Sequence, residues 1–193
     1  MSMYSINQDL DVQSSSASSP IPVGINENVT CTSVAKKADK NGKSYLSFGF
    51  KDAKCNELSH NEFEINPEYV TPKDGETVDQ AVERRVNNML IRVKHICTKF
   101  IDESQFVVNG NTYDEFCDNL VNLMSNANLS NAIRLKVVYD YRDYNSLPNF
   151  APFIEGQADN PSKLRLTSYD KLERTAEKVT AEAASSNEPD LPF

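Results

Sequence analysis

The chain has 193 residues, of which 39% are hydrophobic and 25% charged, and its formal net charge is -8. This length predicts one folded domain, and no apolar run reaches the roughly 18 residues that a membrane span needs. The polar, Ser-rich start lacks the pattern of a signal peptide, and the four cysteines form no C-x-x-C pair. We therefore expect a soluble cytoplasmic protein with reduced thiols, without a disulfide framework or zinc knuckle.

Three strands are predicted in the first part of the chain. Residues 1–19 have the composition of a disordered arm, and two prolines that follow mark the entry into ordered structure. Alternation of apolar and polar residues predicts strands over 23–35, 44–51 and 58–66. The pair Asn41–Gly42 predicts a tight turn between the first two strands, which makes them a hairpin.

The alternation also predicts which side chains of these strands face the core. Leu46, Phe48 and Phe50 are expected inside, and Tyr45 with Lys51 on the opposite face. On the third strand we expect Glu62 and Glu64 on the outer face in solvent, with Phe63 and Ile65 facing opposite to them. Core packing and base stacking both stay open as the role of Phe63.

Helical periodicity replaces alternation in the middle of the chain. Thr77 and Gln80 stand at capping-box spacing before a long apolar stripe that ends at Phe100. Thr112 and Glu115 repeat this spacing before a second stripe. Packing against a sheet is the expected use of both stripes, and a partner-binding face is the alternative.

Strand signals return after the helices. Alternating residues predict a strand over 133–139, a short strand over 150–154 and a further one over 164–166, followed by a helix-like segment that begins at Tyr169.

This order of elements is typical of an OB-fold, a five-stranded Greek-key barrel. We expect a mainly β fold with a helical insertion (β+α), in which a long helical segment separates strands 3 and 4. The OB-fold domain would cover residues 20–168, followed by a helical extension over 169–180 and a flexible acidic tail over 181–193. An unrelated α+β sandwich with the same element order is the alternative.

The tail ends in acidic residues, two prolines and a terminal Phe. A partner pocket can bind such an apolar ring together with the free carboxylate, although a frayed terminus that happens to end in Phe is the alternative. Asp190, Leu191, Pro192 and Phe193 are similar to the tip of bacterial and phage single-stranded DNA-binding proteins. Residues 20–66 and 133–155 resemble the OB-fold proteins of that role in tailed phages.

The resemblance implies a protein that coats single-stranded DNA without strong sequence preference during replication, recombination and repair. It implies that the tip recruits the enzymes of these processes, that the tail competes with DNA for a basic groove, and that the protein acts in the bacterial cytoplasm of a phage host. A homo-oligomer is compatible with this reading.

Binding of a single strand needs cations along the backbone and rings on which bases stack. The sequence places cations close to aromatic residues in the first hairpin and in the later strands, although hairpin lysines that only protect a sheet edge are an alternative. The candidate DNA-binding residues are Lys36, Lys37, Lys40, Lys43, Tyr45, Lys51, Lys54, Arg134, Lys136, Arg142 and Tyr144.

No catalytic or cofactor motif is recognised, because the chain lacks a P-loop pattern, a nucleophile elbow and an H-E-x-x-H sequence. His60 and His95 are isolated from cysteine and carboxylate clusters, so neither a metal nor a cofactor is expected and the protein is not predicted to be an enzyme. Two alternatives stay open: a structural or adaptor protein, such as a virion or replisome scaffold that pairs through its long helices, and a nuclease-like enzyme that uses Glu62, Glu64 and Asp140.

Overall fold

The structure is a computed structural model that describes residues 18–175. Its strands are β1 (Gly24–Ala38), β2 (Ser44–Lys51), β3 (Glu57–Phe63), β4 (Ile133–Tyr139), β5 (Asn145–Ser146) and β6 (Ile154–Gly156). Its helices are α1 (Val78–Cys97) and α2 (Tyr113–Met124), with single 3-10 turns at Pro67–Tyr69 and Glu103–Gln105. The predicted N-terminal arm up to residue 17, the acidic tail and its tip lie outside the described residues.

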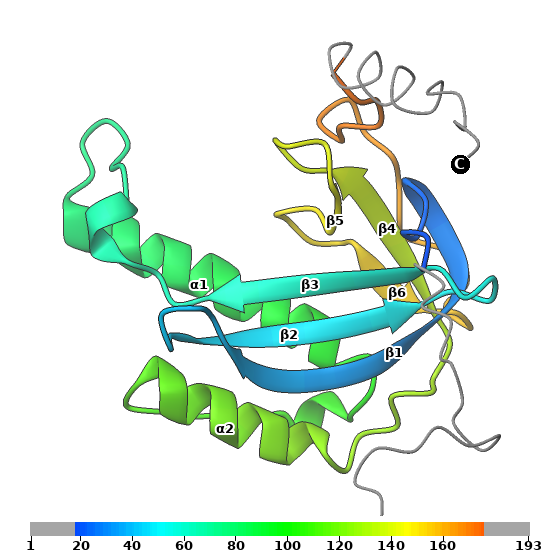
Figure 1. Ribbon diagram of the computed structural model, residues 1–193, viewed down its shortest axis with the longest axis horizontal. Helices are drawn as coiled ribbons and strands as arrows, with labels where there is room; N and C mark the ends of the chain where they lie inside the picture. Colours follow the sequence, from blue (N-terminus) through cyan, green and yellow to red (C-terminus); the bar gives the residue numbers. More distant parts are fainter. Residues whose placement is uncertain (1–17, 176–193) are drawn as a thin grey trace, which may run out of the picture.

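The strands form one antiparallel sheet in which β1 is the central element (Figure 1). The strand order is β3-β2-β1-β4-β5, and β6 pairs with β4. The 15 residues of β1 serve two partners, because its first half pairs with β4 and its second half with β2. Register shifts within β1 bend the strand between these two pairings. β3 and β5, at opposite ends of the order, approach each other.

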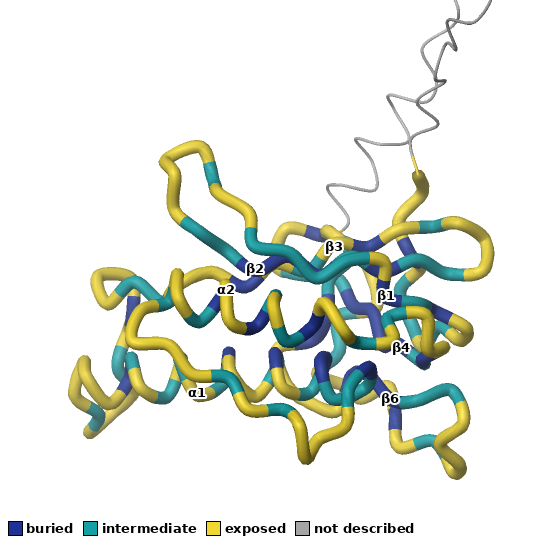
Figure 2. Tube along the Cα trace, turned by 90° about the horizontal axis from the view of Figure 1, so that it is seen from below, coloured by how far each residue is buried: buried dark blue, intermediate teal, exposed yellow. Residues whose placement is uncertain are grey.

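Both helices lie on the same side of β1, β2 and β3 (Figures 1 and 2). The N-terminus of α1 confirms the predicted capping box, since the Thr77 side chain accepts a hydrogen bond from the Gln80 amide and the Gln80 side chain accepts one from the Thr77 amide. The buried core between helices and sheet includes Phe48 and Phe50 of β2, Val93 and Ile96 of α1, and Leu120 of α2. The helical insertion therefore covers the inner face of the sheet. Within residues 18–175, neither helix combines the length and apolar character of a membrane span.

The segment after β5 differs most from the sequence prediction. The predicted strand over 150–154 is replaced by β6, which begins at Ile154, and residues 164–166 form no strand. Pro152 lacks an amide hydrogen, so regular pairing begins only beyond it. The predicted helix from Tyr169 is wrong as far as Thr175, because this segment has turns and bends. It lies beside β4, where the Tyr139 amide donates a hydrogen bond to the Lys171 carbonyl at 2.8 Å.

The prediction for Glu62 is also wrong, because this side chain is buried rather than solvated. The register of β3 places Glu62 opposite Leu46, on the face that the helices cover. Arg92 of α1 binds its carboxylate through two hydrogen bonds of 2.6 and 2.7 Å, and His60 Nε2 lies 2.9 Å from it. A cation from a helix 30 residues later in the chain thus balances a charge that the local pattern assigned to solvent.

Candidate nucleic-acid interface

The face of β1, β2 and β3 that points away from the helices is built mainly from small side chains. Direct cross-strand partners share a face of an antiparallel sheet, so the register defines this group of residues. We call it the outer surface. Its members are Thr30, Ser33, Ala35 and Lys37 on β1, Tyr45, Ser47, Gly49 and Lys51 on β2, and Glu57, Ser59, Asn61 and Phe63 on β3.

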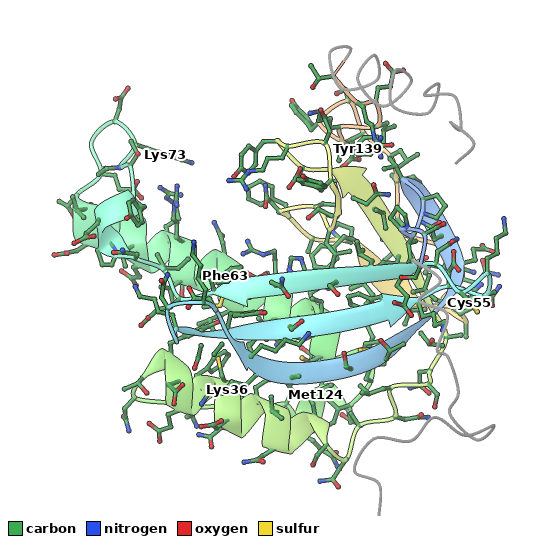
Figure 3. All side chains as sticks on the ribbon, viewed as in Figure 1. Lys36, Cys55, Phe63, Lys73, Met124 and Tyr139 are labelled. Atoms are coloured by element: carbon green, nitrogen blue, oxygen red, sulfur yellow. The ribbon has the colours of Figure 1, made fainter. Side chains whose placement is uncertain are left out.

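Two aromatic rings stack at one end of the outer surface. Tyr45 and Phe63 are cross-strand partners, with ring centroids 4.9 Å apart and planes inclined by 29°. Phe63 is 51% exposed, and Figure 3 shows it at the end of β3. On the other side of Tyr45, its partner on β1 is the exposed Lys37. The sequence identified Tyr45 and Lys37 but left the role of Phe63 undecided. Only the strand register shows that the Phe63 ring stacks on Tyr45 and enlarges the aromatic surface, which we call the stacked platform.

The lysines that are contiguous in the sequence divide into two groups at opposite ends of β2. Lys37, Lys40 and Lys43 surround the β1–β2 turn beside the rings, whereas Lys51 and Lys54 lie at the β2–β3 turn. An eight-residue strand separates these turns by about 25 Å. Lys37 and Lys40 form no ion pair among residues 18–175, while the Lys51 ammonium lies 3.7 Å from the Glu57 carboxylate. The group beside the rings is therefore the better placed to meet a phosphate backbone.

Lys36 does not belong to the outer surface, although it precedes Lys37. Its partner on β2 is Leu46, so its side chain points to the helix side of the sheet. The ammonium forms ion pairs of 2.8 and 2.9 Å with Asp114 and Asp118 of α2, and these hydrogen bonds raise its pKa. Lys36 thus connects β1 to α2 (Figure 3).

Arg134 and Lys136 lie on the outer face of β4, which the segment over residues 157–171 covers. Lys136 is only 6% exposed and binds Asp170 at 3.0 Å and the Arg165 carbonyl at 3.1 Å. Arg134 binds the buried Glu155 carboxylate at 3.1 Å. Both cations bind groups of the covering segment. The sequence prediction did not include this contact, because the strand pattern alone left this face of β4 open to solvent.

Arg142 and Tyr144 are exposed in the turn between β4 and β5, so Arg142 does not share a strand face with Arg134 and Lys136. The Arg142 guanidinium lies 5.0 Å from the centre of the Tyr141 ring, which is also exposed. This turn therefore presents a second group of rings and a cation, and Tyr141 adds to the residues that the sequence had singled out.

The chain matches no family model, no curated protein and no solved structure. Among residues 18–175, no group of three or more His, Cys, Asp or Glu side chains is suited to a metal ion.

Proposed function

We propose that this protein binds single-stranded DNA and coats it without strong sequence preference. The observation that carries the proposal is the stacked Tyr45–Phe63 pair beside Lys37 at one end of the outer surface. Stacking on an aromatic ring stabilises a bound base by about 1 to 3 kcal/mol, whichever base it is. Small neighbours such as Ala35 and Gly49 let the strand approach the sheet closely.

We also propose that the fold is an OB-fold. Three features support this assignment: β1 pairs with both β2 and β4, the helical segment separates β3 from β4, and β3 approaches β5. Proteins of this fold bind strands across strands 2 and 3 and the flanking loops. The Tyr45–Phe63 pair lies on those strands, and Tyr141, Arg142 and Tyr144 lie in the β4–β5 loop.

The proposed binding residues change accordingly. Lys36, Arg134 and Lys136 have structural partners and leave the set, whereas Phe63 and Tyr141 join it. The proposed set is Lys37, Lys40, Lys43, Tyr45, Lys51, Lys54, Phe63, Tyr141, Arg142 and Tyr144. The resemblance of the tail supports a role in replication, recombination and repair within a bacterial cytoplasm.

A gel-shift series with oligo-dT, duplex DNA and RNA at two salt concentrations tests the proposal. Oligo-dT affinity should fall steeply with salt, with a slope of log K against log salt near -0.7 for each phosphate contact on a single strand. Tyr45→Ala and Phe63→Ala should each lower the affinity about 5- to 100-fold through lost stacking. Tyr69→Ala, which removes an exposed ring outside the outer surface, is the matched control. Salt-insensitive or undetectable binding by the wild type contradicts the proposal.

We further propose that Asp190 to Phe193 recruit enzymes of replication, recombination and repair. Deletion of these residues should leave DNA affinity unchanged or slightly higher, because they are acidic and apolar rather than cationic. It should abolish capture of a replication enzyme in a pull-down assay. Equal capture by the truncated chain removes this part of the proposal.

A groove beside α1 favours a second candidate, the adaptor that pairs through its helices. This groove has a volume of about 710 Å³ and is lined by Val86, Met89 and Leu90 of α1 with Val108 and Phe116. Ile91 is exposed on the same helix. If the adaptor reading holds, Leu90→Lys should abolish self-association in analytical ultracentrifugation without a change in DNA affinity. A monomeric wild type that binds oligo-dT contradicts the adaptor reading.

A further inference from the structure

Phe150 presents an exposed ring at the junction of two pockets outside the outer surface. It belongs to the segment between β5 and β6 and is 72% exposed. One pocket, of about 360 Å³, lies between α1 and the residues that follow β3. The other, of about 530 Å³, lies over β4 and the segment that covers it. Phe150 and Asn149 line both pockets.

The pocket beside α1 contains one available cation. Arg84 and Arg92 line it, but Glu76 binds the first at 2.8 and 2.9 Å and Glu62 binds the second at 2.6 and 2.7 Å. Arg85 lines the same pocket, is exposed, and forms no ion pair within residues 18–175. Its guanidinium is therefore free to bind an anion, with the two internally paired arginines beside it.

The pocket over β4 contains cations and a second exposed ring. Lys163 and Arg165 line it, and the Arg165 guanidinium donates to the carbonyls of Ser162 and Leu164, which leaves its charge unbalanced. Among the described residues, Asp170 is the only acidic one in this lining, and it forms an ion pair with Lys136 at 3.0 Å. Tyr169, also in the lining, is 97% exposed. The pocket therefore combines positive charge with an available aromatic face.

The pocket beside α1 adjoins the residues that follow β3, and Asn149 and Phe150 connect it with the pocket over β4. Ile65 lines the pocket beside α1 and stands two residues after Phe63, which carries the stacked platform. A strand that passes from the Tyr45–Phe63 pair beyond the end of β3 would have Arg85 and the Phe150 ring in one pocket within reach, and the cations over β4 in the adjoining pocket. Rings and cations alternate along this route, as single-strand binding requires.

We propose that Phe150 and its two flanking pockets form a second nucleotide-binding site, which extends the path of the strand beyond the outer surface. This inference rests on the proposed function. The Phe150 ring stacks on a base, Arg85 binds the phosphate on one side through its planar guanidinium, and Lys163 with Arg165 bind the phosphate on the other side. Because cations stand on both sides of the ring, the ligand is a strand of several nucleotides rather than a free nucleotide.

A length series of oligo-dT, from about 4 to 16 nucleotides, tests the inference by fluorescence anisotropy. Short oligonucleotides occupy the outer surface alone, so Phe150→Ala and Arg85→Ala should leave their affinity unchanged. For the longest ones, Phe150→Ala should lower the affinity about 5- to 100-fold. Arg85→Ala should reduce the salt slope by about 0.7. Tyr45→Ala should weaken binding at every length.

Two control variants match the changes at the proposed site. Tyr69→Ala removes an equally exposed ring, and Lys94→Ala removes a cation nine residues after Arg85, on the opposite face of α1. Wild-type affinity in Phe150→Ala and Arg85→Ala at all lengths, with Tyr45→Ala still defective, overturns the second site and leaves the proposed function standing. Equal losses for short and long strands also overturn it, because Phe150 would then belong to the first site. If the wild type binds no oligonucleotide, the proposed function fails and this inference fails with it.

Discussion

His95 is held in the structure as a neutral hydrogen-bond acceptor. Its Nε2 accepts a hydrogen bond from the Phe153 amide at 3.3 Å, and its ring lies edge-on to the Phe153 ring, with centroids 4.9 Å apart. Burial, with a smaller contribution from the nearby Lys99 charge, lowers the pKa of His95 to about 4. Protonation would remove the acceptor and place a charge in a half-buried site, so the native state resists it.

We predict that this imidazole makes stability depend on pH in mildly acidic solution. The unfolded chain binds the proton with an ordinary His pKa of about 6.5, so it holds more protons than the native state between about pH 6.5 and 4. The contribution is complete above this window and is lost as the pH falls through it. Urea unfolding at pH 7.5, 6, 5 and 4.5 measures the effect. His95→Gln, which keeps an acceptor but does not titrate, should flatten the curve, and parallel curves for the two proteins contradict the prediction.

The Glu62–Arg92 ion pair is a second place where burial determines the contribution of a charged side chain to stability. Burial opposes ionisation of Glu62, but the hydrogen bonds from Arg92 and His60 outweigh it, so its pKa is lowered. Arg92→Ala should leave a buried carboxylate without its cation and lower the free energy of unfolding by about 3 to 5 kcal/mol. Since the pKa of Glu62 is lowered, the wild-type stabilisation is present at neutral pH and is lost in acid as the pH falls through the native pKa.

Arg84→Ala is the matched control for Arg92→Ala. It removes an equally bidentate Arg–Glu pair on the same helix, but the Arg84 and Glu76 side chains are more exposed than Arg92 and Glu62. Exposed pairs contribute about 0 to 1 kcal/mol. Chemical denaturation measures the free energy of unfolding of both variants. Equal losses for Arg92→Ala and Arg84→Ala would show that burial of the Glu62 carboxylate does not cause the larger loss expected for Arg92→Ala.

At the scale of elements, sequence patterns predict the helices, strands and turns whose conformation is determined by their own residues. The bounds of β2 match the predicted strand, and α1 and α2 both follow the Thr residues that the capping boxes identified. The turn at Gly42 has the positive φ of 79° that its Asn-Gly pair favours. The segments after β5 were predicted poorly, since contacts with β4 rather than local periodicity determine their conformation.

The loop before α2 depends on a close approach that only glycine allows. A Cβ atom on Gly110 would lie 2.4 Å from the Phe116 amide nitrogen and 2.7 Å from its Cα. Gly110→Ala should therefore displace the loop from the first turn of α2 and lower the free energy of unfolding by about 1 to 3 kcal/mol. Thermal unfolding measures this loss. The neighbouring Asn111→Ala, which shortens an exposed side chain, should be close to neutral, and equal stability of both variants would contradict the close packing.

At the scale of the whole molecule, the sequence predicted the composition of the candidate interface better than its geometry. It identified Tyr45, Lys37, Arg142 and Tyr144 from local alternation and charge. It did not separate Lys36 from Lys37, and it left Lys136 on an open face. These distinctions depend on α2 and on the segment over residues 157–171, which lie far from the strands in sequence and close to them in space.

The adjacent lysines on β1 provide a test of whether face or net charge governs DNA binding. Lys36→Ala and Lys37→Ala change the net charge of the molecule equally, but Lys37 lies beside the rings and Lys36 pairs with α2. Lys37→Ala should lower oligo-dT affinity and reduce the salt slope by about 0.7, because one phosphate contact is lost. Lys36→Ala should leave both quantities unchanged and reduce thermal stability, since Asp114 and Asp118 lose their cation. Anisotropy titrations at several salt concentrations decide between the two cases, and equal losses of affinity would mean that overall charge rather than the outer surface attracts the strand.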